Sequence, residues 1–128
     1  MGHLADITLV SHLVEDPINE IGKKAGRPDL FADILQACIN EEAFLFMEDT
    51  SFTVLKPEVI HGVKEMLVWV AYSATGNAYE LFMPFIEERA KEVGCDEITF
   101  WTALEPINRY IQRHGGWRKK YTIWSKDV

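Results

Sequence analysis

The pattern of apolar and polar positions is clearest in the second half of the chain, where a continuous apolar run precedes a long helical repeat. Every residue from Met66 to Val70 is apolar, which is typical of a strand buried on both faces of a sheet. Over 77–93 apolar residues recur at helical spacing with charged residues on the opposite face, and Gly94 then supplies a helix C-cap. We therefore predict a strand at 64–70 that leads through a short loop into an amphipathic helix.

Shorter elements are predicted on either side of this unit. A helix that connects two strands of one sheet makes them parallel neighbours, so we expect the strands at 64–70 and 97–103 to be parallel and crossed by the helix at 77–93. The fold class is therefore α/β in the broad sense (α+β). The other expected elements are a strand at 7–10, helices at 14–25 and 30–39, a hairpin of strands at 43–47 and 51–55, a helix at 105–114 and a last strand at 117–124.

Size and composition fit one folded domain. A chain of 128 residues, 48% hydrophobic and 26% charged, has room for one core, and we expect a single domain over 1–128. The apolar runs are too short for a membrane span, and the N-terminus has no leader-like pattern. Two distant cysteines do not make a disulfide framework, so we expect a cytoplasmic protein with reduced thiols.

The net charge of −7 is unevenly distributed along the chain. Residues 1–108 carry 7 basic and 19 acidic side chains, whereas residues 109–128 carry 6 basic and 1 acidic. A basic tail on an acidic body argues against a general nucleic-acid binder, which needs a broad positive face. Two interpretations stay open: a local anion site, or a solvated terminal strand whose lysines discourage edge pairing.

The loop between the expected central strand and the long helix is the best candidate for a binding site. Ser73-Ala74-Thr75-Gly76-Asn77-Ala78 is rich in small residues and ends at the helix N-terminus. Successive backbone N–H groups and the positive end of a helix dipole bind phosphate where a small side chain lets the anion approach, as Gly76 and Ala78 would. A glycine between a strand and a helix is also a common plain turn, and this alternative stays open.

This loop and its surroundings resemble the GCN5-related N-acetyltransferase (GNAT) superfamily, over nearly the whole chain and most clearly over 63–124. The superfamily's loop pattern is Q/R-x-x-G-x-G/A; Gly76 and Ala78 match its two small positions, and Ser73 replaces the Gln or Arg. Gly115-Gly116-Trp117 stands where the superfamily has a Gly-Phe corner. The resemblance implies a GNAT-like mixed central sheet with helices on both faces, and acetyl-CoA or another acyl-CoA as the cofactor.

In the superfamily, the backbone amides of this loop hold the CoA pyrophosphate, and the backbone of the preceding strand pairs with the pantetheine arm. A helix Asn contacts the same arm. Because the loop and strand contacts come from the main chain, we expect the serine at 73 to cost one side-chain contact only. The residues that the resemblance assigns to the cofactor are Val68, Val70, Ser73, Ala74, Thr75, Gly76, Asn77, Ala78 and Asn108.

Acyl transfer to an amine needs a base that deprotonates the ammonium and donors for the developing oxyanion. Glu65 on the central strand is our candidate base, with an ordinary solvent-facing carboxylate as the alternative, and strand N–H groups near Val70 are candidate donors. Tyr110 is the candidate acid. It departs from the superfamily's pattern, in which a Tyr stands four residues before the corner glycine, where this chain has Ile111 or Gln112.

Other reactive side chains carry weaker signals. Glu58 and His61 are further candidates for the base. Cys95 has no supporting His, so we expect a structural or surface thiol rather than a nucleophile. The four histidines show no spacing typical of metal ligands, and we predict no metal site.

Two classes of function follow. The first is an acetyl-CoA-dependent N-acyltransferase that acts on an amine of a small molecule or protein, with the acidic body steering a cationic acceptor. The second is a non-catalytic protein on the same fold, a phage virion component or an accessory or inhibitor protein acting through protein contacts, because this small divergent chain resembles bacteriophage-encoded GNAT-like proteins. The tryptophans at 101, 117 and 124 are then either core residues or an assembly surface. We expect neither nucleic acid nor membrane as a partner, and pairing of last strands would give a homodimer.

Overall fold

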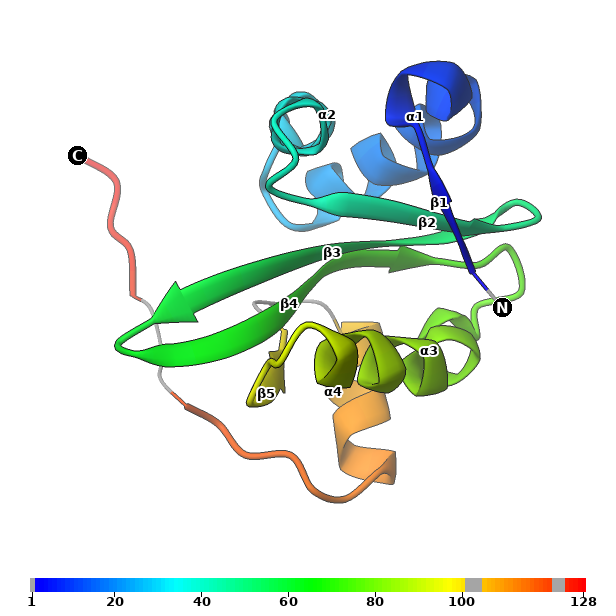
Figure 1. Ribbon diagram of the computed structural model, residues 1–128. Helices are drawn as coiled ribbons and strands as arrows, with labels where there is room; N and C mark the ends of the chain where they lie inside the picture. Colours follow the sequence, from blue (N-terminus) through cyan, green and yellow to red (C-terminus); the bar gives the residue numbers. More distant parts are fainter. Residues whose placement is uncertain (1, 101–104, 121–123) are drawn as a thin grey trace.

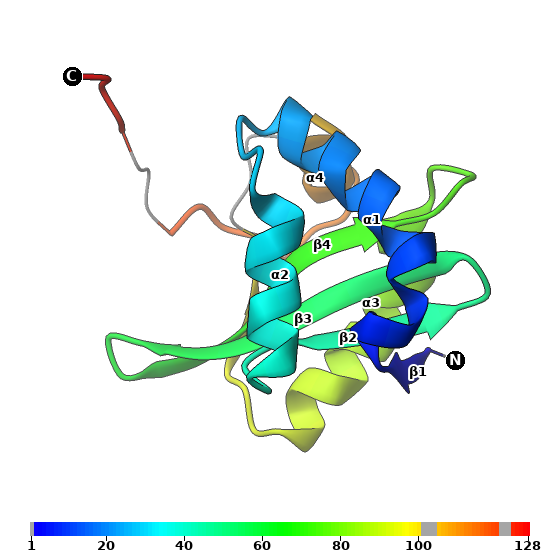
Figure 2. The same cartoon turned by 90° about the horizontal axis from the view of Figure 1, so that it is seen from above.

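In the computed structural model, which describes residues 2–100, 105–120 and 124–128, one sheet lies between two pairs of helices (Figure 1). Helices α1 and α2 lie across one face of the sheet, and α3 and α4 lie on the other (Figure 2). The strands follow the order β1-β2-β3-β4-β5, and neighbours are antiparallel except β4 and β5, which are parallel as predicted. The elements are β1 (His3–Ala5), α1 (Ile7–Lys24), α2 (Leu30–Ile39), β2 (Phe44–Glu48), β3 (Ser51–Ile60), β4 (Val63–Tyr72), α3 (Ala78–Glu92), β5 (Glu97–Thr99) and α4 (Glu105–Arg113).

The first helix begins earlier than predicted. Residues 7–10, expected as a strand, form the first turns of α1, because the Asp6 side chain accepts a hydrogen bond from the Thr8 backbone N–H at 2.9 Å and caps the helix. The N-terminal strand is instead β1, which pairs with β2. The second helix, α2, has the predicted bounds.

Strands β3 and β4 form a hairpin that extends beyond the predicted strands at 51–55 and 64–70. Its two turn residues, His61 and Gly62, have φ angles of 52° and 80°, the left-handed conformation that a tight two-residue hairpin turn requires. Residues 56–60 were not predicted as a strand because apolar and polar residues do not alternate regularly there.

Helix α3 ends as its sequence predicts. Gly94 has a φ of 74°, its N–H donates to the Lys91 carbonyl, and the Cys95 N–H donates to the Ala90 carbonyl at 2.8 Å. This pair of bonds is the Schellman motif, in which a glycine closes the helix without the steric cost of a Cβ.

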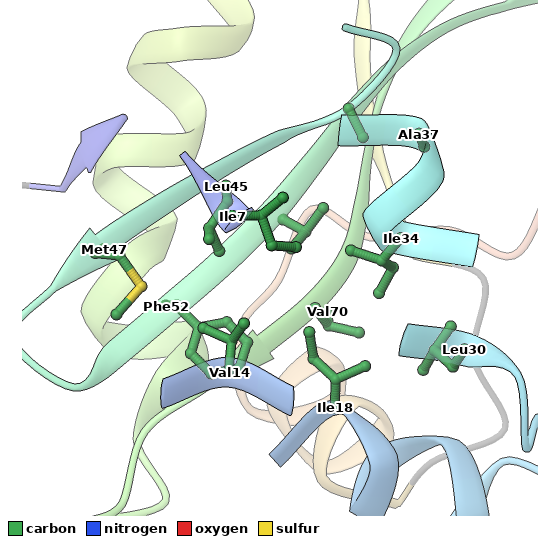
Figure 3. Packing of buried hydrophobic residues seen from close by; sticks show 12 residues of the cluster. Ile7, Val14, Ile18, Leu30, Ile34, Ala37, Leu45, Met47, Phe52 and Val70 are labelled. Carbon is green, nitrogen blue, oxygen red and sulfur yellow. The ribbon is translucent and has the colours of Figure 1, made fainter. Parts of the chain in front are cut away.

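Two apolar clusters flank the sheet. Figure 3 shows the cluster beneath α1 and α2, in which Val14 and Ile18 pack on Phe52 and Val70. The second cluster lies beneath α3 and includes Val68. Each large apolar side chain buried in this way contributes about 1.5–3 kcal/mol. Val70 of the first cluster and Ala71 of the second are adjacent on β4, which confirms the prediction of a strand buried on both faces.

The C-terminal part differs from the prediction. Residues 117–120 and 124 are not in a strand, and 121–123 of the expected strand at 117–124 lie outside the described residues. Residues 117–120 instead reach the sheet through long charged side chains, because Arg118 bonds Glu97 and Lys120 bonds Glu65. Phe100 follows β5 outside the strand, and 101–103 lie outside the described residues.

Trp117 and Trp124 lie in different environments. Trp117 is partly buried against the second apolar cluster, whereas Trp124 is 90% exposed and is not a core residue. Trp101 lies outside the described residues. Within the described ranges, no helix is both long and apolar enough to cross a membrane.

Candidate functional site

The candidate site is organised around β4, which lies between β3 and β5. The register pairs Val54 with Val70 and Leu55 with Val68, so Trp69 is an extra residue on β4. This is a β-bulge, which bends the strand and re-aims its backbone groups, and bulges are over-represented next to active sites. The bulge lies where the sequence predicted oxyanion donors near Val70.

A buried hydroxyl fixes the bulge. Thr53 is fully buried, and its Oγ1 donates a hydrogen bond to the Val70 carbonyl at 2.9 Å. In the low dielectric of the core such a bond is costly to leave unmade, so it holds the Val70 peptide in one orientation. Thr53 is therefore a positioning residue that sequence reasoning missed, because no local pattern distinguishes it from any other strand threonine.

Beyond the bulge, β4 offers main-chain groups on one side. Within the described residues β5 pairs with β4 only at 65–67, so the backbone of 68–72 has no strand partner there on that side. The side chains of Val68 and Val70 are both buried, in opposite apolar clusters. What this stretch presents to a ligand is its backbone, as the resemblance to acetyltransferases implies.

The loop that follows β4 is exposed and internally bonded. The Gly76 N–H donates to the Ser73 carbonyl at 3.0 Å, and Gly76 has a φ of 79°. The Ser73 hydroxyl donates to Asn77 Oδ1 at 2.9 Å, and the Thr75 hydroxyl donates to the same atom at 2.6 Å. Ala74 is exposed as well, while Ala78 turns into the α3 cluster.

This loop fits an anionic group. Apart from Gly76 and its two chain neighbours, no atom of the described residues lies within 4 Å of the position that a Cβ on Gly76 would take, so a ligand can approach the backbone closely. The first N–H groups of α3 have no intrahelical partners and carry the positive end of the helix dipole.

Charged side chains beside the loop largely offset one another. Glu80 in the first turn of α3 would repel an anion, but Arg113 Nη2 lies 3.2 Å and His114 Nε2 lies 4.0 Å from Glu80 Oε1. These groups are exposed, so they add little to stability. They bring the basic end of α4 next to the loop.

At the other end of β4 the structure places Glu65 in an unexpected setting. This side chain is 1% exposed, so the solvent-facing alternative is wrong. Its Oε1 accepts a hydrogen bond from Lys120 Nζ at 2.8 Å, and Lys120 also donates to Glu97 Oε1 at 3.0 Å. Arg118 Nη2 donates to Glu97 Oε2 at 2.6 Å.

The hydrogen bonds of this cluster lower the pKa of Glu97 and raise the pKa of Lys120. The hydrogen bond from Lys120 lowers the pKa of Glu97 below its ordinary 4.5, and the attraction of Arg118 adds to this. The hydrogen bond to Glu65, followed by that to Glu97, raises the pKa of Lys120 above 10.5. The ammonium and the Glu97 carboxylate are therefore both charged near neutral pH.

The candidate acid, Tyr110, is buried. It packs among Tyr79, Trp117 and His114, with its ring centroid 4.4 Å from that of His114. Burial, followed by repulsion from Glu80, raises the pKa of Tyr110. The phenol is therefore a weak acid that stays protonated near neutral pH.

A cleft of about 1200 Å³ runs around β5 and the segment that follows α4. Glu65, Asn108 and Cys95 all line it, which brings together residues of β4, of α4 and of the segment between α3 and β5. Burial raises the pKa of the Cys95 thiol, so a thiolate nucleophile is disfavoured, as expected. The weaker candidates Glu58 and His61 lie on the β3–β4 hairpin, where Glu58 pairs with Lys56 at 3.1 Å.

The residues that sequence reasoning missed are Thr53, Glu97, Arg118 and Lys120, together with the bulge at Trp69. The only available signal was the run of basic residues in the tail, which was interpreted as an anion site or a solvated strand. Neither interpretation included an ion pair with a buried carboxylate. Recognising it required the register of β4 against β5, which the sequence does not contain.

Comparison with solved structures finds the same fold in acetyltransferases. A probable acetyltransferase matches with a TM-score of 0.72 and 12% identity, over 99% of this chain and 99% of that one. Ribosomal-protein-alanine N-acetyltransferase from Brucella melitensis biovar Abortus matches with a TM-score of 0.61 and 17% identity, over 98% and 99% of the two chains. Aminoglycoside N-acetyltransferase AAC(6')-Iy in complex with CoA matches with a TM-score of 0.62 and 13% identity, over 100% and 99%.

These identities establish the fold alone. The chain has the GNAT-like α+β fold, a mixed five-stranded sheet with four helices in the described residues, which confirms the predicted fold class. No family model matches the sequence, and no curated protein matches it.

Proposed function

We propose that the protein is an acyl-CoA-dependent N-acyltransferase, with acetyl-CoA as the simplest donor and an amine as the acceptor. The observation that carries the proposal is the continuous backbone surface formed by the bulged half of β4, the open loop at Gly76 and the N-terminus of α3. This surface offers main-chain donors to a long ligand that ends in phosphates. The fold shared with acetyltransferases supports the same assignment.

The cofactor would be held mainly by main-chain groups. Gly76, Asn77 and Ala78 lie at the phosphate end, and the 68–70 backbone lies along the arm. Asn108, which lines the cleft, is a further polar contact. When bound, acyl-CoA supplies an activated thioester.

The remaining chemistry belongs to the chain's own groups. Glu65 accepts the proton that an incoming ammonium must lose, and backbone N–H groups at the bulge stabilise the developing negative charge on oxygen. Tyr110 stays a candidate acid, and its burial requires a local rearrangement before it can reach a leaving thiolate.

Isothermal titration of the purified protein with acetyl-CoA and with CoA tests the proposal. Gly76→Glu puts a side chain and a negative charge where the phosphates would lie, and we expect binding to weaken by about 100-fold or more. Gly62→Glu is the matched control, because Gly62 has a similar φ of 80° and open surroundings at the other end of β4. Absence of binding to wild type, or equal binding by both variants, would reject this cofactor site.

A non-catalytic protein on the same fold is the second candidate. It is favoured by two observations: Glu65 already holds an ion pair with Lys120, and Tyr110 is buried. Here the protein would act through protein contacts, and its likeness to bacteriophage-encoded members stays a prediction. Binding of acetyl-CoA with no CoA release in the presence of any amine would support this candidate over the first.

A further inference from the structure

Three glutamates lie side by side across the sheet. Glu58 on β3 pairs with Glu65 on β4, and Glu65 pairs with Glu97 on β5, so the three side chains point to the same face. Like charges directly opposite each other are destabilising. The row therefore needs cations, and Lys56 supplies one to Glu58 at its β3 end.

The β4–β5 end of the row leaves polar groups without partners. Lys120 Nζ bonds Glu65 Oε1 and Glu97 Oε1, which uses two of the three hydrogen bonds that an ammonium can donate. Glu65 Oε2 is buried without a partner among the described residues, and so is the hydroxyl of Thr99, two positions along β5 on the same face as Glu97. Both residues line the cleft. A buried carboxylate oxygen without a partner is costly, and it points to a ligand that carries N–H donors.

The Lys120 side chain that bonds these carboxylates comes from an irregular segment. Residues 115–120 are in neither a helix nor a strand and make no backbone hydrogen bond to the rest of the described chain. Arg118, Lys120 and the partly buried Trp117 attach the segment through side chains. Since 115–120 share no backbone bonds with the rest of the described chain, a competing cation can displace the Lys120 side chain without breaking the β4–β5 pairing.

We propose that Glu65, Glu97 and Thr99 form a binding site for a primary alkylammonium ion, and that Lys120 of the chain's own tail occupies this site until such an amine displaces it. The site would select a cation with three N–H donors on a flexible alkyl stem, the chemistry of the lysine side chain that fills it. That the bound amine is the acyl acceptor rests on the proposed function. The binding site itself does not.

Titration calorimetry with n-butylammonium tests the binding site directly, because this ion reproduces the end of a lysine side chain. In full-length Lys120→Ala the site is vacated, and we expect butylammonium to bind roughly tenfold or more tightly than to wild type, where Lys120 competes. Lys119→Ala is the matched control: it removes the same charge from the adjacent exposed residue, and we expect it to behave as wild type. Butyltrimethylammonium, which has no N–H donor, should bind no variant measurably.

The proposal would be overturned if Lys120→Ala and Lys119→Ala bound butylammonium equally. It would also be overturned if Lys120→Ala bound butyltrimethylammonium as tightly as butylammonium. If circular dichroism shows that Lys120→Ala is unfolded, the titration uses Lys120→Met instead, because this variant keeps an apolar stem. Adding Glu65→Gln to the vacated variant should abolish the gain in affinity, and retention of the gain would also count against the site. The titration contains no CoA, so its failure is separate from a failure of acetyl-CoA to bind.

Discussion

The two ends of β4 carry two different kinds of candidate site. At its C-terminal end, Ser73 to Ala78 form a loop of contiguous residues, mostly exposed and bonded among themselves. At its N-terminal end, Glu65, Glu97 and Lys120 come from β4, β5 and the tail; Glu65 is buried there, whereas Glu97 and Lys120 are partly exposed.

This difference predicts a difference in energetics. The loop needs only short-range bonds, and its exposed hydrogen bonds exchange readily with water, so single side chains there matter little. In the cluster at the N-terminal end, the Glu65 side chain has lost its hydration, and removing the Lys120 ammonium leaves it without a partner. We therefore expect mutations around Glu65 to lower the stability of the protein more than mutations in the loop do.

The largest effect should follow removal of the Lys120 ammonium from the buried Glu65 side chain. Lys120→Met keeps the apolar stem but leaves the Glu65 carboxylate buried without a counter-charge, and we expect the melting temperature to fall by roughly 8–10 °C. Lys119→Met should change it by no more than about 2 °C. Thermal unfolding followed by circular dichroism measures both, and equal shifts would remove the distinction between the two ends of β4.

The difference in melting temperature between wild type and Lys120→Met should vanish at extremes of pH. The lowered pKa of Glu97 means that its contribution is present above its ordinary 4.5 and is lost as pH falls through the lower folded-state value. The raised pKa of Lys120 means that its contribution is present below 10.5 and is lost as pH rises through the higher folded-state value. The gap in melting temperature between wild type and Lys120→Met should be widest from about pH 5 to 10 and narrow outside it. A gap that does not change with pH would show that the pair contributes by packing alone.

An intermediate effect is expected at the bulge between the two ends. Thr53→Val preserves shape but removes the donor to the Val70 carbonyl, and we expect a loss of about 1 kcal/mol in the free energy of unfolding. Urea denaturation measures it, with Thr50→Val in the exposed β2–β3 turn as the control. If the bulge also orients acyl-CoA, the variant should bind acetyl-CoA more weakly than the control does.

The smallest effect is expected in the loop. Ser73→Ala removes one exposed hydroxyl, and we expect about 0.5 kcal/mol or less in stability and about a threefold change in acetyl-CoA affinity, because the proposed contacts come from the main chain. Calorimetry and urea denaturation together test this. A loss of binding as severe as that of Gly76→Glu would mean that the Ser73 side chain itself holds the ligand.

Prediction from the sequence succeeded where structure is decided by neighbours in the chain. Helix α2, the amphipathic pattern of α3 and its closure at Gly94 follow from periodicity and capping residues a few positions apart. The parallel pairing of β4 and β5 followed from the helix between them. The strand expected at 7–10 was wrong because apolar residues there suit either state, and the cap at Asp6 with burial against the sheet selected the helix.

What the sequence alone determined about this protein is its α+β class and the position of the loop at Gly76, because each depends on interactions within one or two turns of chain. Only the tertiary structure decided that Glu65 is buried, that Trp69 is a bulge, and that Lys120 meets two carboxylates. These features depend on strand register and on contacts between distant segments. A register shift of one residue would turn Glu65 to the opposite face, and no local pattern of the sequence fixes that choice.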